Sequence, residues 1–128
     1  MAEDIVLSDL QLELVRVLWR SGELSVAEVT EALADRGLAH TTVATLLTRL
    51  EKRGAVAVRR DGRMLVYTAC VSEAQVKRNM VSSLIAQVFR GDPEALLAHL
   101  VSEREVAQGD LEQVRALLQG DDDDGRVP

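Results

Sequence analysis

The chain is poor in the residue types on which several protein classes depend. Its 128 residues include two prolines, one cysteine (Cys70) and three aromatic residues, Trp19, Tyr67 and Phe89. A single cysteine excludes an internal disulfide and any metal site built from clustered cysteines. No uncharged stretch is long enough to span a bilayer, and no basic start precedes an apolar segment. We therefore expect a cytoplasmic protein.

The sequence also lacks the patterns that catalytic and cofactor sites require. It has no paired nucleophile and base, no glycine-rich phosphate loop and no metal-ligand spacing, so we expect no enzymatic activity, cofactor or metal. For His99, within a leucine-rich stripe, we favour a partly buried structural role over a ligand or a pH switch. For Cys70 we favour a small core residue over a redox switch.

The chain is rich in small and aliphatic residues instead, with 19 Leu, 17 Val and 15 Ala. Such a composition with little proline favours helices, and the valines favour a few strands. The length fits one domain or two small lobes.

Charge is distributed unevenly along the chain. The net charge of −6 by itself argues against a nucleic-acid partner, but residues 40–68 carry a net charge of +4 while the segments 1–39 and 69–128 each carry −5. A basic block between acidic ones indicates a surface that meets an anion, or else an ordinary solvated basic face.

Local signals predict where the helices begin and end. Ser8, Ser25 and Ser72 are each followed three residues later by Gln or Glu, which is the capping-box pattern, and Asp92-Pro93 is a fourth helix start. Apolar residues at helical spacing predict helices over 9–20, 26–35 and about 41–53, and three more after Ser72, the last of which ends at Gly120. Residues 121–128 form an acidic tail that we expect to be disordered.

The hydrophobic period changes to two between residues 55 and 68. Two valine-containing runs, 55–60 and 63–68, flank Asp61-Gly62, which predicts a hairpin whose tight turn has positive φ at both of these residues. Two helices, a short turn and a basic hairpin form the layout of a winged helix-turn-helix. We expect a mainly α fold with a small β-hairpin wing: a winged helix-turn-helix at 1–71, then a helical dimerisation domain at 72–120.

The helix over 41–53 is the expected recognition helix. Its outer face is short and rich in hydroxyls, which suits close approach to DNA bases and phosphates, although a plain solvated face would look the same. Arginines near the hairpin tip would reach the flanking backbone or the minor groove. The candidate DNA-binding residues are His40, Thr41, Thr42, Thr45, Thr48, Arg49, Lys52, Arg59, Arg60 and Arg63. His40 could equally cap the helix.

The helices after Ser72 carry more apolar residues than one small lobe can cover. A second copy of the chain would bury them, and its two-fold symmetry would match a palindromic operator. The candidate dimerisation residues are Val76, Met80, Leu84, Val88, Leu96, Leu97, Leu100, Leu111, Val114, Leu117 and Leu118.

Four blocks of the sequence resemble the penicillinase-repressor family (BlaI/MecI/CopY). They are 17–22 (VLWRSG), 25–29 (SVAEV), 40–50 (HTTVATLLTRL) and 52–54 (KRG). The resemblance implies a dimeric repressor that binds a palindromic operator, often of β-lactam-resistance genes. It assigns His40, Thr41, Thr42, Thr45 and Arg49 to the recognition helix and Arg59, Arg60 and Arg63 to the wing.

The resemblance also implies a way in which repression could end. Members linked to a sensor are cut by a protease at an Asn-Phe bond. The matching bond here is His99-Leu100, so the resemblance does not decide whether this chain is cleaved. Cys70 alone cannot reproduce the cysteine cluster of the copper-responsive branch. Two other functions remain: a winged-helix module that binds proteins, and a repressor that senses a small ligand in a pocket between its two lobes.

Overall fold

The computed structural model describes the backbone of residues 5–125 and the side chains of residues 5–119. The chain forms two compact units that divide between Ser83 and Leu84. This division lies inside a helix, and not before Ser72 where the sequence pattern placed the start of the second domain. The expected mainly α fold with a small β wing is confirmed.

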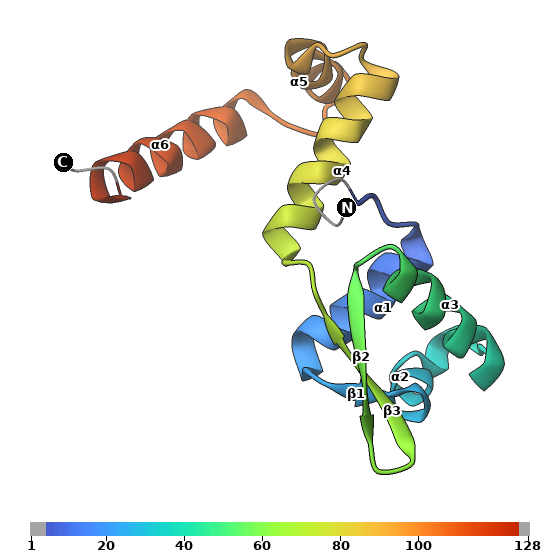
Figure 1. Cartoon of the computed structure of the whole chain (residues 1–128). Helices are drawn as coiled ribbons and strands as arrows, with labels where there is room; N and C mark the ends of the chain where they lie inside the picture. Colours follow the sequence, from blue (N-terminus) through green and yellow to red (C-terminus); the bar gives the residue numbers. More distant parts are fainter. Residues whose placement is uncertain (1–4, 126–128) are drawn as a thin grey trace. The chain divides into compact units, whose positions relative to one another are not determined.

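The first unit contains a helix-turn-helix and a three-stranded sheet (Figure 1). Its elements are α1 (Asp9–Ser21), β1 (Leu24–Ser25), α2 (Val26–Ala32), α3 (His40–Lys52), β2 (Val56–Asp61), β3 (Met64–Ala69) and most of α4 (Glu73–Val88). The second unit contains the end of α4, then α5 (Pro93–Ser102) and α6 (Gln108–Gly125).

The predicted helix starts are confirmed by hydrogen bonds of the capping side chains. Ser8 and Ser25 form complete capping boxes at the starts of α1 and α2. The Ser72 hydroxyl accepts a hydrogen bond of 3.1 Å from a backbone N–H in the first turn of α4. The Asp92 carboxylate does the same at α5, where Pro93 is the first helical residue. These caps satisfy amide groups that a helix end leaves without partners.

The sheet has the antiparallel order β1-β3-β2. The strand β1 has two residues, too few to produce a hydrophobic period in the sequence, and it was missed. The hairpin is confirmed, but its turn is shifted by one residue. Asp61 pairs with Met64, so Gly62 and Arg63 form the turn, and Gly62 has φ +64° whereas Arg63 has no positive φ. Glycine at the first turn position is typical of a type II′ turn.

One hydrophobic core holds the first unit together. The side chains of Leu14, Leu18, Val43 and Leu47 are each at most 2% exposed. Val76 of α4 belongs to this core, and Met80 packs against it. Both residues were expected at a dimer interface. That expectation is wrong for Val76, because the protomer itself buries this side chain.

Two helix ends differ from the sequence-based expectation. The helix α2 ends at Ala32 because Leu33 has the non-helical angles φ −103° and ψ 27°, and a 3₁₀ turn, Ala34–Arg36, follows before Gly37. The helix α6 continues past Gly120 to Gly125, since one glycine costs a helix only about 0.5–1 kcal/mol. Residues 126–128 of the expected disordered tail lie outside the described residues.

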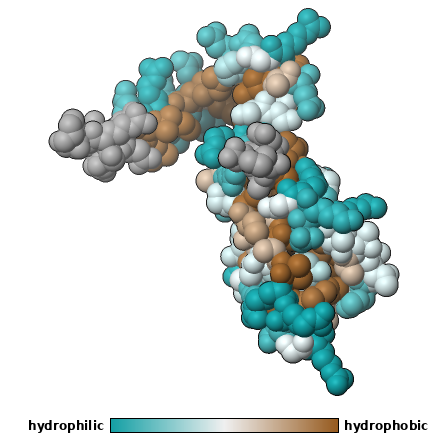
Figure 2. Space-filling view, viewed as in Figure 1, coloured by the Kyte–Doolittle hydropathy of each residue, from teal (hydrophilic) through white to brown (hydrophobic). Residues whose placement is uncertain are grey.

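The second unit has no buried side chain among its described residues. Several large apolar side chains are instead exposed, and brown, apolar surface runs along α6 in Figure 2. These exposed residues are Leu84, Val88, Leu97, Val101, Val114, Leu117 and Leu118. The second unit therefore exposes the kind of surface that other proteins bury.

Candidate nucleic-acid interface

The helix α3 has one anchored face and one free face. Val43, Leu47 and Leu50 are completely buried, which fixes the rotation of the helix about its axis. The opposite face is exposed along the helix and carries Thr41, Thr42, Thr45, Thr48, Arg49 and Lys52. His40, in the first turn, is also exposed and lines a recess beside the start of α2. All seven α3 residues that the sequence pattern assigned to DNA binding are therefore accessible to a ligand.

The threonine hydroxyls of this face already donate hydrogen bonds. Thr45 Oγ1 donates to the Thr41 carbonyl at 3.0 Å, and Thr48 Oγ1 donates to the Ala44 carbonyl at 2.9 Å. A hydroxyl has one hydrogen, so in this conformation both oxygens can only accept from a ligand. In this conformation Thr45 and Thr48 could therefore accept hydrogen bonds from base amino groups and contact bases through their methyl groups, but they could not donate to a phosphate.

The first turn of α3 has no side-chain cap. Its N-cap residue is Ala39, with φ −70° and ψ 150° and no capping hydrogen bond, and the turn contains no acidic residue. The alternative that His40 caps the helix is wrong, because His40 is itself the first helical residue. The backbone N–H groups of this turn and the positive end of the helix dipole therefore lie at the edge of the exposed α3 face.

The arginines of the hairpin β2–β3, which we call the wing, fall into two groups. Arg59 makes a two-pronged ion pair with Glu23, at 2.6 Å from Nε and 2.5 Å from Nη2 to the carboxylate oxygens. Arg59 holds the pKa of Glu23 below its ordinary value, and Glu23 raises the pKa of Arg59. Arg60 and Arg63 are exposed and make no ion pair with any residue that the structure describes.

Arg53, which also contributes to the basic block, has a structural role. Its guanidinium donates to the Gln11 side chain at 3.1 Å and to the Val6 carbonyl at 2.7 Å. These bonds connect the end of α3 to the segment that leads into α1. The basic groups that stay free to meet an anion are therefore Arg49, Lys52, Arg60 and Arg63.

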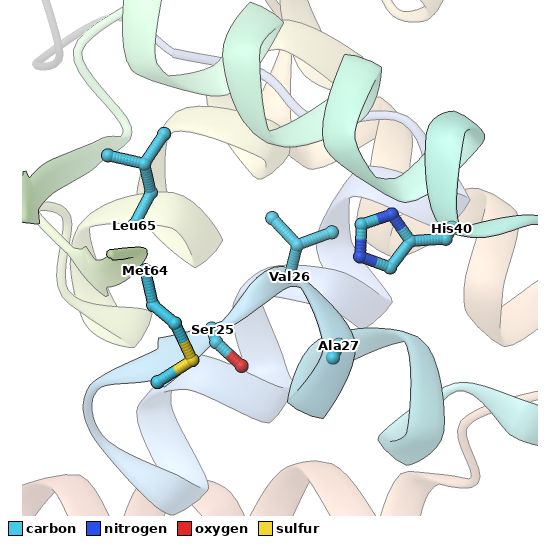
Figure 3. Close-up of a pocket in the computed structure, with 6 residues that line it drawn as sticks. All are labelled: Ser25, Val26, Ala27, His40, Met64 and Leu65. Atoms are coloured by element: carbon cyan, nitrogen blue, oxygen red, sulfur yellow. The ribbon is translucent and has the colours of Figure 1, made fainter. Parts of the chain in front are cut away.

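A recess of about 310 Å³ lies among the starts of α2 and α3 and the wing. Figure 3 shows its lining residues, which are Ser25, Val26, Ala27, His40, Met64 and Leu65. Met64 and Leu65 are 52% and 43% exposed. Neither residue could be identified from the distribution of charge along the chain. The available signal was a pair of large apolar residues beside the turn of an exposed hairpin.

Two single residues lie elsewhere than expected. Cys70, which follows β3, is exposed and not buried. Its backbone N–H donates a 2.8 Å hydrogen bond to the Ala55 carbonyl. His99 is also exposed, not partly buried, and its ring lies 5.8 Å from that of Phe89. The bond between His99 and Leu100 lies inside α5.

Two kinds of structural feature are absent from the described part of the chain. None of its helices has the length and apolar character needed to cross a membrane. Among the described side chains, residues 5–119, no group of three or more of the metal-binding types is placed to hold an ion.

Comparisons with known proteins point to one family. Residues 7–120 match the family described as penicillinase repressor. The methicillin resistance regulatory protein MecI of Mammaliicoccus sciuri is 25% identical over 88% of this chain and 92% of its own length. The penicillinase repressor of Bacillus licheniformis is 23% identical over 88% of this chain and 89% of its own length. The crystal structure of the YusO protein from Bacillus subtilis has a TM-score of 0.51. It is 16% identical and covers 89% of this chain and 73% of its own, so the similarity shows the fold alone.

Proposed function

We propose, from the premise that the chain belongs to the penicillinase repressor family and is a DNA-binding transcriptional repressor, that it acts as a homodimer on a palindromic operator. In this proposal α3 enters the major groove and the wing lies on the flanking backbone. The regulated genes respond to β-lactams, in keeping with the names of two relatives, the methicillin resistance regulatory protein MecI and the penicillinase repressor. The protein works in the cytoplasm, where the operator is.

The exposed face of α3 is the observation that carries the proposal. Three buried residues hold the helix while six polar residues on the other side remain accessible. Arg49 is long enough to reach a guanine edge, and Thr45 and Thr48 offer acceptors and methyl groups to bases. The uncapped first turn of α3 suits a DNA phosphate, because its amide groups need an acceptor and the helix dipole favours negative charge.

The uncovered apolar residues of the second unit support the dimer. Exposed leucines and valines on α4, α5 and α6 are costly to leave in water, and a second copy offers the same residues for a self-complementary interface. A dimer with two recognition helices would read half-sites separated by about 34–36 Å or a multiple of it.

The experiment that tests the proposal is selection of genomic DNA fragments by the purified full-length protein, followed by sequencing. The expected result is a shared inverted repeat. Fragments without a common repeat would contradict the palindromic operator, and the absence of salt-dependent DNA binding would favour a protein-binding module.

Substitutions then separate base reading from backbone contacts on the selected operator. Thr45→Ala and Arg49→Ala should each cost about 1–3 kcal/mol on the operator and little on random DNA. Arg60→Ala and Arg63→Ala should weaken binding to all sequences alike. Equal profiles for the two groups would contradict the division between α3 and the wing.

The last step of the proposal is release of the operator after cleavage of the repressor. A cut at His99-Leu100 by a sensor protease would remove α6 and with it Leu117 and Leu118 of the dimer surface. Because this bond is inside a helix, a protease must first unwind α5 locally. Following the size of the repressor on a gel while the target gene is induced with a β-lactam tests this step, and an intact band at full induction would exclude it.

A further inference from the structure

The ion pair between Glu23 and Arg59 crosses the sheet of the first unit. In the strand register, Arg59 of β2 lies opposite Val66 of β3, which lies opposite Ser25 of β1. Glu23 precedes Ser25 by two residues, so in an extended chain it lies on the same face as Arg59. The Arg59 side chain therefore reaches over the central strand and joins the outer strand of the wing to the segment between α1 and β1.

Arg60 lies on the other face of the wing. Its strand partner is Leu65, whereas Arg59 is paired with Val66, and successive residues of a strand point to opposite faces. A surface that contacts DNA through Arg60 cannot include Arg59 on the same face. Arg63 lies in the turn at the tip, where it can meet a phosphate from either side.

The Glu23 carboxylate also competes with DNA for Arg59. Both contacts are charge-assisted, and the pair occupies two of the five N–H donors of the guanidinium, so the side chain must leave Glu23 before these donors can meet a phosphate. If Arg59 turned to a phosphate, Glu23 would lose its partner and stand near another negative group. Arg60 and Arg63 carry no such cost.

We propose that Arg59 is a positioning residue that Glu23 holds in place, so that the wing presents Arg60 and Arg63, and not Arg59, to the DNA phosphates. This inference rests on the proposed contact between wing and DNA. It assigns a role to Glu23, an acidic residue outside the basic block, and it withdraws Arg59 from the expected DNA-binding residues.

Salt titrations of binding to a labelled mixed-sequence DNA duplex test the assignment on the full-length protein. Arg60→Ala and Arg63→Ala should each flatten the plot of log affinity against log salt by about 0.9 for one lost phosphate contact. Arg59→Ala should leave this slope unchanged and lower the affinity only about two- to fivefold, as loss of an exposed ion pair does. A slope reduced by about 0.9 in Arg59→Ala would overturn the proposal.

Substitutions of Glu23 should change the DNA affinity in opposite directions for the two possible roles of Arg59. If Arg59 positions the wing, Glu23→Gln lowers affinity as Arg59→Ala does, and the double variant is no weaker than either. The exchanged pair, Glu23→Arg with Arg59→Glu, then restores affinity. If Arg59 binds phosphate, Glu23→Gln strengthens binding and steepens the slope, while the exchanged pair stays weak; either result would overturn the proposal.

A measurement without DNA separates failure of this inference from failure of the proposed wing contact. Hydrogen exchange of the wing amides should be faster in Glu23→Gln than in the wild type, while amides of the buried face of α3 stay unchanged. Glu13→Gln is the matched control, because Glu13 makes an exposed 3.1 Å ion pair with Arg36 away from the wing. Wing exchange unchanged in Glu23→Gln would contradict the positioning role. If the salt slopes of Arg60→Ala and Arg63→Ala equal that of the wild type, the proposed contact between wing and DNA is wrong, whereas the positioning role of Arg59 is not affected.

Discussion

The two units of the chain differ in how they bury apolar residues. In the first unit, helices and strands share one core in which eight large side chains are less than 2% exposed, and the last of these along the chain is Val76. In residues 77–119 no side chain is buried, although Leu and Val recur at helical spacing. Leu117 is 68% exposed, whereas Leu14, in the same kind of amphipathic helix, is 0% exposed.

This difference teaches that the same sequence pattern serves two purposes. A helix with an apolar stripe must bury it against something. The first unit supplies its own partners, because α1, α2, α3 and the sheet close around a common interior. The second unit offers stripes without an internal partner among its described residues, so we propose that its stability depends on association. The proposed division into a self-sufficient DNA-binding unit and an associating unit follows from this contrast.

The largest expected effect is on the surface of the second unit. Leu117→Glu places a charge in the proposed dimer interface, so the protein should become monomeric and lose about 10²- to 10⁴-fold in operator affinity, because linked binding of two half-sites is lost. Light scattering and DNA titration measure this. Gln119→Glu, on the same helix but off the apolar stripe, is the matched control for added charge. A dimeric Leu117→Glu protein with full affinity would remove the contrast between the units.

A second test compares leucines of the two units. Leu14→Ala should lower the free energy of unfolding by about 2–5 kcal/mol at any protein concentration, because it leaves a cavity in the core. Leu118→Ala should act only through association, so its effect on the melting temperature should depend on protein concentration. Denaturation at several concentrations measures both. Concentration-independent destabilisation by Leu118→Ala would show that the second unit buries this residue by itself.

A third test uses α3, the one α-helix among the described residues of the first unit whose start lacks a capping side chain. Ala39→Ser and Ala39→Asp should each stabilise the first unit by about 0.5–2 kcal/mol, since a side-chain oxygen then accepts from the first turn of α3. Ala39→Asp should in addition weaken DNA binding, because its carboxylate meets the phosphate that we expect there. Urea denaturation and DNA titration check the pair. Equal DNA affinity of the two variants would contradict a phosphate at this turn.

The smallest expected effect is on the pH dependence of the wing. The Glu23 pKa lies below its ordinary value of 4.5 because Arg59 hydrogen-bonds the charged carboxylate. A lowered pKa in the folded state means that the pair stabilises the protein above pH 4.5 and that this contribution disappears as the pH falls through the lowered value. An NMR titration of the Glu23 carboxyl carbon should give a midpoint that rises toward 4.5 in Arg59→Ala. An unmoved midpoint would contradict the pair in solution.

Much of the first unit could be predicted from sequence because its signals are local. Ser8 and Ser25 act on amides three residues away, and the buried positions of α3 follow from a spacing of three and four residues. The errors occur where the deciding contact is distant. The strand β1 exists because Leu24 pairs with Tyr67, and no pattern in residues 24 and 25 records that partner.

The DNA-binding site shows the same limit. The exposed α3 residues were predicted because burial of one helix face exposes the other. The role of Arg59 could not be predicted, because its partner is 36 residues away in the chain. Counting charge between residues 40 and 68 treated all arginines alike, and the structure separates Arg53 and Arg59, which have protein partners, from Arg60 and Arg63.

By itself the sequence determined most of the helices, the hairpin, the exposed face of α3 and the resemblance to a repressor family. Each of these depends on capping, on periodicity or on residue order, which act over a few positions. Only the tertiary structure decided that Val76 belongs to the first core, that Cys70 and His99 are exposed, and that Glu23 holds Arg59. Burial, exposure and ion pairing depend on which surfaces meet when distant parts of the chain pack together, and no local pattern in the sequence records those surfaces.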